Sequence, residues 1–293
     1  MVRCEMRIRP DGFNGEVRLV NYMYRYKYLP NKEGLLKLLS DRTVKFTHPS
    51  DFNDPFDCFP STPRTKLSSL KSTNPALYDR LGLNLLKGVE KIQELDRIRK
   101  RLESRSGGGN QLDYLLKDAS VLSLSRIPNS ILMWSHYADF HKGAVVEFKI
   151  PTNAWSAGKL YFNHEDLIAL DVEYKAERPV FRNDGSKSNS HTILNTLFLT
   201  KAKEWEYEEE SRVIKNDGGA GIFPFRPCLL NGLILGAKNK DGALFDKLLR
   251  KVSGEIGKHV ALYQAEFCKT EYKIKIPRFN FKIDEKDTGE RNR

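Results

Sequence analysis

Three short segments hold the residues whose types and spacing could do chemistry. The first, MWSHYADFHKGAVVEF at residues 133–148, places Trp134, His136, Tyr137 and His141 directly before an apolar run. Aromatic rings stack on planar ligands and histidine titrates near neutral pH, so this segment favours a pocket mouth for a nucleotide-type ligand. The alternative is that Trp134 and Tyr137 belong to the core and that both histidines lie on the surface.

The second segment is KEWEYEEESRVI at residues 203–214. If it is a strand, Glu208, Glu210 and Arg212 share one face, because side chains alternate along a strand. Two neighbouring carboxylates repel each other, which raises the pKa of one of them, and Arg212 can offset this. If the segment is helical, Glu208 and Arg212 form an ordinary i,i+4 pair, and a solvated acidic stripe is then the alternative to a site.

The third segment, FNDPFD at residues 52–57, is a turn. Asn53 and Asp54 can bond their own backbone, and Pro55 fixes the following φ angle. One interpretation is a structural turn whose phenylalanines enter the core. The other is a rigid turn that presents Asn53 or Asp54 at a cleft.

A metal site is the rival explanation for His136, His141, Asp54, Glu208 and Glu210. The spacing of His136 and His141 is not that of two metal ligands on one helix face, so we expect no metal. The four cysteines are scattered and form no C-x-x-C pair, which fits a reducing cytoplasm.

The elements that must position these residues follow from the hydrophobic patterning. Strands are expected at 17–28, 42–49, 119–126, 143–150, 167–174, 207–214, 229–237, 259–267 and 272–276, and helices at 32–41, 129–140, 192–205 and 242–256. Because strands cluster rather than alternate with helices, we predict an α+β fold with a single mixed or antiparallel sheet, either continuous or split. Residues 1–62 and 119–277 form the predicted core domain, 63–118 a helical insert with a flexible SGGGN break, and 278–293 a charged, disordered tail.

The chain has 293 residues, a formal net charge of +11 and a pI near 9.3. A basic surface favours polyanions such as nucleic acid or nucleotides, although it can simply solvate the protein. No apolar run is long enough for a membrane span and the N-terminus has no apolar signal region, so we expect a cytoplasmic protein without membrane contact.

Together these motifs resemble a known family. The order is YKY at 26–28, FNDPFD at 52–57, MWSHYADFHKG at 133–143, WEYEEESR at 205–212 and GLILG at 232–236. This pattern resembles the bacterial domain of unknown function 2971 over nearly the whole chain. The resemblance implies a bacterial or phage-borne cytosolic protein and assigns no activity.

A looser resemblance is to ADP-ribosyltransferases, whose split β-sheet holds NAD and whose late strand often contains Glu-x-Glu. Glu208 and Glu210 match that form, and Glu210 would be the catalytic carboxylate. The early-strand residue is Arg25 or Tyr26, and the middle residue is Ser125 or Tyr137. The sequence lacks an early histidine and an unambiguous Ser-Thr-Ser.

This resemblance gives the leading hypothesis, an enzyme that uses NAD as substrate and either transfers ADP-ribose or releases nicotinamide. A carboxylate beside the ribose would stabilise the oxocarbenium character that develops as the bond breaks. Trp134 or Tyr137 would stack on nicotinamide, and Arg25 or Lys27 would pair with the pyrophosphate. The expected catalytic set is Glu210, Glu208, Tyr137 and His136, and the expected NAD-binding set is Arg25, Tyr26, Lys27, Ser125, Trp134, His141 and Arg212, with Asn53 and Asp54 in the adjoining turn.

Two other functions stay open. One is a metal-dependent nuclease or phosphodiesterase that uses His136, His141, Asp54 and an acid from 208–210. The other is a non-catalytic module that binds nucleic acid or another partner through its basic surface.

Overall fold

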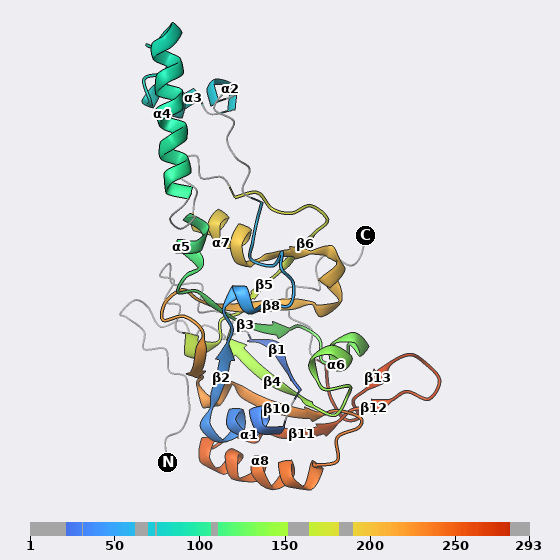
Figure 1. Ribbon diagram of the computed structural model, residues 1–293. Helices are drawn as coiled ribbons and strands as arrows, with labels where there is room; N and C mark the ends of the chain where they lie inside the picture. Colours follow the sequence, from blue (N-terminus) through green and yellow to red (C-terminus); the bar gives the residue numbers. More distant parts are fainter. Residues whose placement is uncertain are drawn as a thin grey trace, which may run out of the picture.

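A mixed β-sheet organises the computed structural model, which describes residues 22–30, 32–61, 70–73, 75–106, 111–151, 164–181 and 190–281 (Figure 1). Within these ranges seven strands pair in the order β11-β10-β4-β1-β3-β8-β5. Their bounds are β1 Tyr22–Leu29, β3 Ser120–Ser125, β4 Ala144–Pro151, β5 Leu170–Asp171, β8 Glu210–Lys215, β10 Leu230–Leu235 and β11 Ala261–Gln264. Helices cover the sheet, so the predicted α+β class is confirmed.

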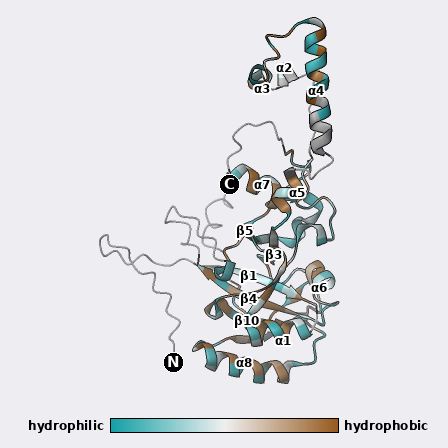
Figure 2. Ribbon diagram, turned by 60° about the vertical axis from the view of Figure 1, so that its left-hand side comes forward, coloured by the Kyte–Doolittle hydropathy of each residue, from teal (hydrophilic) through white to brown (hydrophobic). Residues whose placement is uncertain are grey.

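Helices α1 (Lys32–Asp41) and α8 (Gly242–Ile256) cover one face of the sheet. Helix α8 buries Phe245, Leu249, Val252 and Ile256, which recur every three or four residues and therefore lie on one side. They pack with α1 leucines and with alternate residues of β4 in the largest hydrophobic cluster. Figure 2 shows the resulting alternation of hydrophobic and hydrophilic residues along α8.

Helix α6 (Ile131–Tyr137) packs on the opposite face. Its Met133 and Trp134 form a second cluster with Tyr24, Tyr26 and Tyr28, which alternate along β1 and so point to one side. Ser130 caps this helix by accepting a hydrogen bond from the Met133 N–H. The cap fixes where α6 begins and therefore where its later residues point.

Shorter elements surround the sheet. Strand β2 (Thr43–Phe46) pairs with β9 (Gly221–Pro224), β6 (Glu173–Lys175) pairs in parallel with β7 (Thr200–Ala202), and β12 (Glu266–Phe267) pairs with β13 (Ile274–Lys275). Helix α7 (Ser190–Phe198) packs with α5 (Gln111–Leu116) in a third cluster. The remaining 3-10 turns are η1 Pro49–Asp51, η4 His164–Asp166, η5 Lys203–Glu208 and η6 Pro227–Leu229.

The predicted helical insert contains α2 (Leu70–Thr73), α3 (Pro75–Arg80) and the long α4 (Gly88–Ser106). Figure 1 shows α4 extending away from the sheet. Tyr78, Leu83 and Ile98 form a small cluster of their own between these helices. Residues 107–110 of the SGGGN break, residues 17–21 of the first expected strand and residues 282–293 of the expected tail lie outside the described residues.

The central sheet opens between β1 and β3. Strand β1 pairs with β4 along its whole length and β3 pairs with β8 along its whole length. Within the described chain, however, β1 and β3 share a single register pair, Tyr26 with Ser125. Four residues earlier in β3, Val121 pairs instead with Thr47. We call the opening between these two contacts the strand gap.

Several predicted elements were wrong. The strand expected at 259–267 is two short strands, β11 and β12, in different sheets, and the strand expected at 207–214 begins only at Glu210. The helix expected at 192–205 ends at Phe198, because the chain then pairs with β6 as β7 and continues into η5. The strand expected at 167–174 is two short strands, β5 and β6, in different sheets. Among the described residues no helix is both long and apolar enough to cross a membrane.

Candidate active site

A cavity of about 560 Å³ lies at the strand gap. Residues from both strands that border the gap line it, together with the FNDPFD turn, helix α6 and turn η5. The lining residues are Tyr26, Lys27, Tyr28, Thr47, Asp51, Phe52, Asn53, Asp57, Ser123, Leu124, Ser125, Met133, His136, Tyr137, Lys201, Trp205, Tyr207, Glu208 and Glu210. The four residues expected to be catalytic, Glu210, Glu208, Tyr137 and His136, are therefore brought together.

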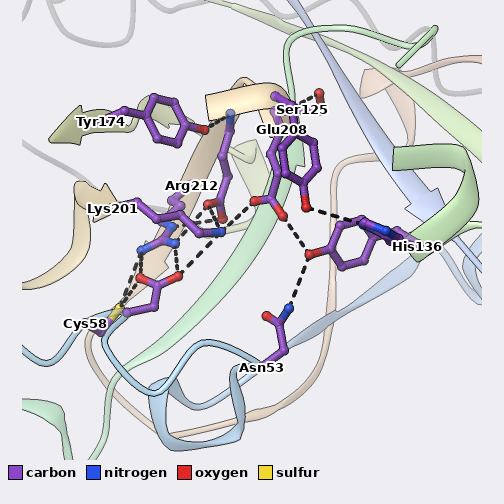
Figure 3. Close-up of polar contacts among 12 residues, drawn as sticks. Asn53, Cys58, Ser125, His136, Tyr174, Lys201, Glu208 and Arg212 are labelled. Carbon is purple, nitrogen blue, oxygen red and sulfur yellow. Dashed lines mark hydrogen bonds and ion pairs between the residues drawn. The ribbon is translucent and has the colours of Figure 1, made fainter. Parts of the chain in front are cut away.

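Lys201 of β7 forms the centre of a buried charge cluster (Figure 3). Among the described residues its Nζ lies 2.5 Å from Glu208, 3.0 Å from Glu210 and 3.6 Å from Asp57. All four side chains are about 95 % buried or more. Burial alone would lower the pKa of Lys201, but Glu210 and Glu208 outweigh it and raise that pKa above the usual range. Lys201 is therefore a permanent cation here.

Arg212 of β8 joins Glu210 to the FNDPFD turn. Its Nε and one Nη bond the two carboxylate oxygens of Glu210, each at 2.9 Å. Its two Nη atoms bond the two oxygens of Asp57 at 2.8 and 2.6 Å, and one also donates to the Phe198 carbonyl at 2.8 Å. All five guanidinium donors are thus used in a fully buried side chain.

Glu208 has a different environment from Glu210. Its Oε1 accepts a 2.6 Å hydrogen bond from the hydroxyl of Tyr137, while its Oε2 accepts from Lys201. Asn53 donates to the same hydroxyl at 3.5 Å. Burial, followed by the hydrogen bond to Glu208, raises the pKa of Tyr137, so this phenol stays protonated and donates. Arg212 bonds Glu210 and Asp57 but not Glu208, so Glu208 is the carboxylate of the charge cluster that lies outside the arginine clamp.

The placement of Glu208 on the same strand as Glu210 was wrong. Glu208 ends the turn η5, and Glu209 follows in the left-handed region with φ of 42°. This reversal lets Glu208 and Glu210 both reach Lys201, although they belong to different elements. Counted at formal charge, three carboxylates and two cations leave the cluster with one excess negative charge.

Some side chains of the segment at residues 133–148 line the cavity, and others belong to the hydrophobic core. His136 and Tyr137 line the cavity, and His136 Nδ1 lies 3.3 Å from the hydroxyl of Tyr207. Trp134 is fully buried, donates its indole N–H to the Pro128 carbonyl, and does not line the cavity. His141 is also buried and stacks on Trp134, so both serve the core rather than a ligand.

The turn after α6, HKG at residues 141–143, requires a glycine at its last position. A Cβ on Gly143 would lie 2.1 Å from the Leu29 carbonyl oxygen, at the end of β1. Only glycine allows this approach without moving backbone. The turn thus locks α6 onto β1, and with it the positions of His136 and Tyr137.

Of the other residues expected to bind NAD, some line the cavity and some do not. Tyr26, Lys27 and Asn53 line the cavity, and Ser125 does so while donating its hydroxyl to the Glu208 carbonyl at 2.7 Å. Arg25 and Arg212 do not line it. Arg25 is bound to Asp171 at 2.9 Å.

In the FNDPFD turn, Asp54 has a different role from its neighbour Asn53. Asp54 lies outside the cavity lining, and its side chain accepts a hydrogen bond from the Phe56 N–H. It therefore fixes the turn. The expectation that both phenylalanines enter the core was wrong, because Phe56 is 61 % exposed and Phe52 is partly buried and lines the cavity.

Sequence reasoning missed several residues of the site. Lys201 fell inside the helix expected at 192–205, and Asp57 was quoted within the turn but not selected. Trp205 and Tyr207 also line the cavity, and the Lys201 ammonium lies 5.1 Å from the Trp205 ring centre. One signal was available: a buried Arg212 requires a carboxylate partner beyond its own strand, and Asp57 was a candidate.

The described residues contain no group of three or more histidine, cysteine, aspartate or glutamate side chains placed to hold a metal ion. Asp57, Glu208 and Glu210 do converge, but the Lys201 ammonium occupies the space among them. His141 is buried and does not line the cavity, whereas His136 does.

Acid titration should reveal the charge cluster. Burial would raise the pKa of Glu210, but Arg212 and Lys201 outweigh it and hold that pKa at about 2, below its ordinary 4.5. A depressed carboxyl pKa stabilises the fold above pH 4.5, and this contribution is lost as the pH falls towards 2. We expect the urea midpoint of wild type to fall across this range and that of Glu210→Gln to fall less. Glu206→Gln, an exposed control, should behave like wild type, and equal slopes for all three would contradict the assignment.

The fold and site define an α+β protein with an acidic, aromatic cavity at an opening of its central sheet. Residues 133–213, less than a third of the chain, match the family model described as Protein of unknown function (DUF2971), so the predicted resemblance is supported over that segment. The matched segment begins at Met133 in α6 and ends in β8, so it contains Tyr137, Lys201, Glu208, Glu210 and Arg212. Comparison with curated proteins and with solved structures gives no match.

Proposed function

We propose that the cavity binds NAD and that the protein breaks the bond between nicotinamide and ribose, either transferring ADP-ribose or releasing it to water. The observation that carries this proposal is the carboxylate of Glu208, held at the cavity wall by Tyr137 and Lys201. A fixed carboxylate stabilises positive charge as it develops on the ribose.

The shape and lining of the cavity support a nucleotide-type ligand. Its volume of about 560 Å³ falls within the usual range for small-molecule sites. The rings of Tyr137, Trp205 and Tyr207 offer surfaces on which an aromatic base can stack. The excess negative charge of the cluster favours a ligand that carries, or develops, positive charge at this end of the cavity.

The position of the cavity also supports the resemblance to ADP-ribosyltransferases. Those enzymes hold NAD in a split sheet, and this cavity lies where β1 and β3 separate. Within the Glu-x-Glu sequence the geometry favours Glu208 as the acting carboxylate, because both oxygens of Glu210 are bound by Arg212. Glu210 then serves to position Lys201.

The test is incubation of the purified protein with NAD, with nicotinamide release measured by chromatography. We expect release that EDTA does not inhibit. No release, together with EDTA-sensitive cleavage of DNA or RNA, would replace this proposal with the metal-dependent nuclease. Salt-sensitive nucleic-acid binding without any turnover would instead favour the non-catalytic module.

A further inference from the structure

Lys27 of β1 projects into the strand gap. Its Nζ donates a 3.0 Å hydrogen bond to the carbonyl of Ser123. Ser123 lies between the two contacts that bound the gap, the pairs Tyr26–Ser125 and Thr47–Val121. Lys27 thus donates to this carbonyl where a backbone N–H of a neighbouring strand would otherwise donate.

The backbone N–H of Ser123 faces the same opening. In an antiparallel ladder, alternate residues direct both of their backbone groups to the same neighbouring strand. Val121 exchanges both of its bonds with Thr47, whereas Arg126 donates to Glu209 on the β8 side. By this alternation Val121, Ser123 and Ser125 face the gap, so the Ser123 N–H and the Lys27 ammonium are donors to one space.

Lys27 differs from the other lysine of the cavity. Lys201 contacts three carboxylates, whereas no carboxylate of the described chain lies within 4.0 Å of the Lys27 nitrogen. An ammonium has three donors, and the Ser123 carbonyl uses one. Burial lowers the pKa of Lys27 to about 8, with Glu210 opposing this effect and Lys45 adding to it. A half-buried cation that interacts with Glu210 only over more than 4.0 Å is stabilised further when an anion binds beside it.

We propose that Lys27 and the backbone N–H of Ser123 form an anion subsite that holds a phosphoryl group of the ligand. This inference rests on the proposed function, because it takes the ligand to be a nucleotide. It selects Lys27 rather than Arg25, which is bound to Asp171 and does not line the cavity.

The subsite gives the ligand a direction in the cavity. Lys27 and Ser123 line it from the strands that border the gap, while Tyr137 lines it from α6 and Tyr207 and Glu208 from η5. A dinucleotide would therefore place a phosphate at the strand gap and the reacting ribose beside Glu208. Phosphate binding and bond cleavage depend on different side chains, so they can be tested separately.

The experiment is isothermal titration calorimetry with ADP-ribose, AMP, adenosine and inorganic phosphate. We expect Lys27→Met to weaken ADP-ribose and AMP binding by about 10- to 100-fold, the usual effect of losing a hydrogen bond to a charged group. Adenosine, which has no phosphate, should bind wild type and Lys27→Met equally. Lys27→Arg keeps the charge and should retain most of the affinity. Competition by inorganic phosphate would show that the phosphoryl group alone suffices.

A matched control is Lys203→Met, because Lys203 is 61 % exposed, pairs with Glu206 and lies outside the cavity lining. It should bind every probe like wild type. Unchanged ADP-ribose affinity in Lys27→Met, an equal loss of adenosine binding, or no binding of any phosphorylated probe by wild type would overturn the subsite. Wild type that binds ADP-ribose through Lys27 but never releases nicotinamide would overturn the proposed reaction and leave the subsite standing.

Discussion

Glu208→Gln should lower the rate of nicotinamide release by about 10²- to 10³-fold, the usual loss when one fixed electrostatic group is removed from a reaction site. Glutamine has nearly the same shape; its single oxygen can still accept a hydrogen bond from Lys201, and its amide N–H can donate to the Tyr137 hydroxyl. It cannot supply the negative charge that faces the ribose. Because the charge acts on the transition state, kcat should fall while the KM for NAD changes little.

The same substitution should leave the protein folded. Lys201 keeps Glu210 at 3.0 Å and Asp57 at 3.6 Å as partners when Glu208 loses its charge. The urea midpoint of the variant therefore needs to be measured beside its turnover. A variant that is folded and inactive assigns the charge of Glu208 to the reaction rather than to stability.

Glu209→Gln is the matched control, since it changes the middle residue of the same Glu-Glu-Glu run. Glu209 is 41 % exposed, pairs with Arg126 at 3.4 Å and does not line the cavity. Its turnover should equal that of wild type. If Glu208→Gln also turned over NAD like wild type, or if both variants were equally impaired, Glu208 would have no specific part in the reaction.

Local patterning was enough to locate the two helices that carry the main core. The predicted ranges 32–41 and 242–256 agree with α1 and α8, because both contain apolar residues at helical spacing between clear breaks. Gly257, with φ of 67°, ends α8 in the left-handed conformation that glycine favours. These signals lie within each segment and require no knowledge of the partners.

The geometry of the candidate site depends on partners that are distant in the sequence. The residues after Phe198 continue a helical pattern, yet Thr200 to Ala202 form β7 because β6 offers a pairing edge. This pairing sets the position of Lys201, so the sequence alone did not identify the residue at the centre of the charge cluster. Likewise, the sequence identified both Tyr137 and Glu208, but their 2.6 Å contact depends on how α6 and η5 pack together.

Arg212→Met should destabilise the fold by about 3–5 kcal/mol, the usual cost of removing one partner from a buried ionic network. Methionine fills much of the volume but leaves Asp57 and Glu210 without the guanidinium that binds both of them. Lys201 can compensate only in part, because it lies 3.6 Å from Asp57 and already contacts Glu208. Arg212→Lys should also be destabilising, since one ammonium cannot reproduce two bidentate contacts.

Equilibrium urea unfolding measures this effect, and Arg250→Met supplies the comparison. Arg250 also binds a carboxylate through its Nε, at 2.9 Å, but its side chain is 79 % exposed. Losing such an exposed surface pair should change the urea midpoint little. A double-mutant cycle then locates the effect: Asp57→Asn should cost less in the Arg212→Met background than in wild type, because the bond between them is already lost. Additive losses, or an Arg212→Met cost as small as that of Arg250→Met, would mean that the network does not join the FNDPFD turn to β8, and the cavity wall would need another support.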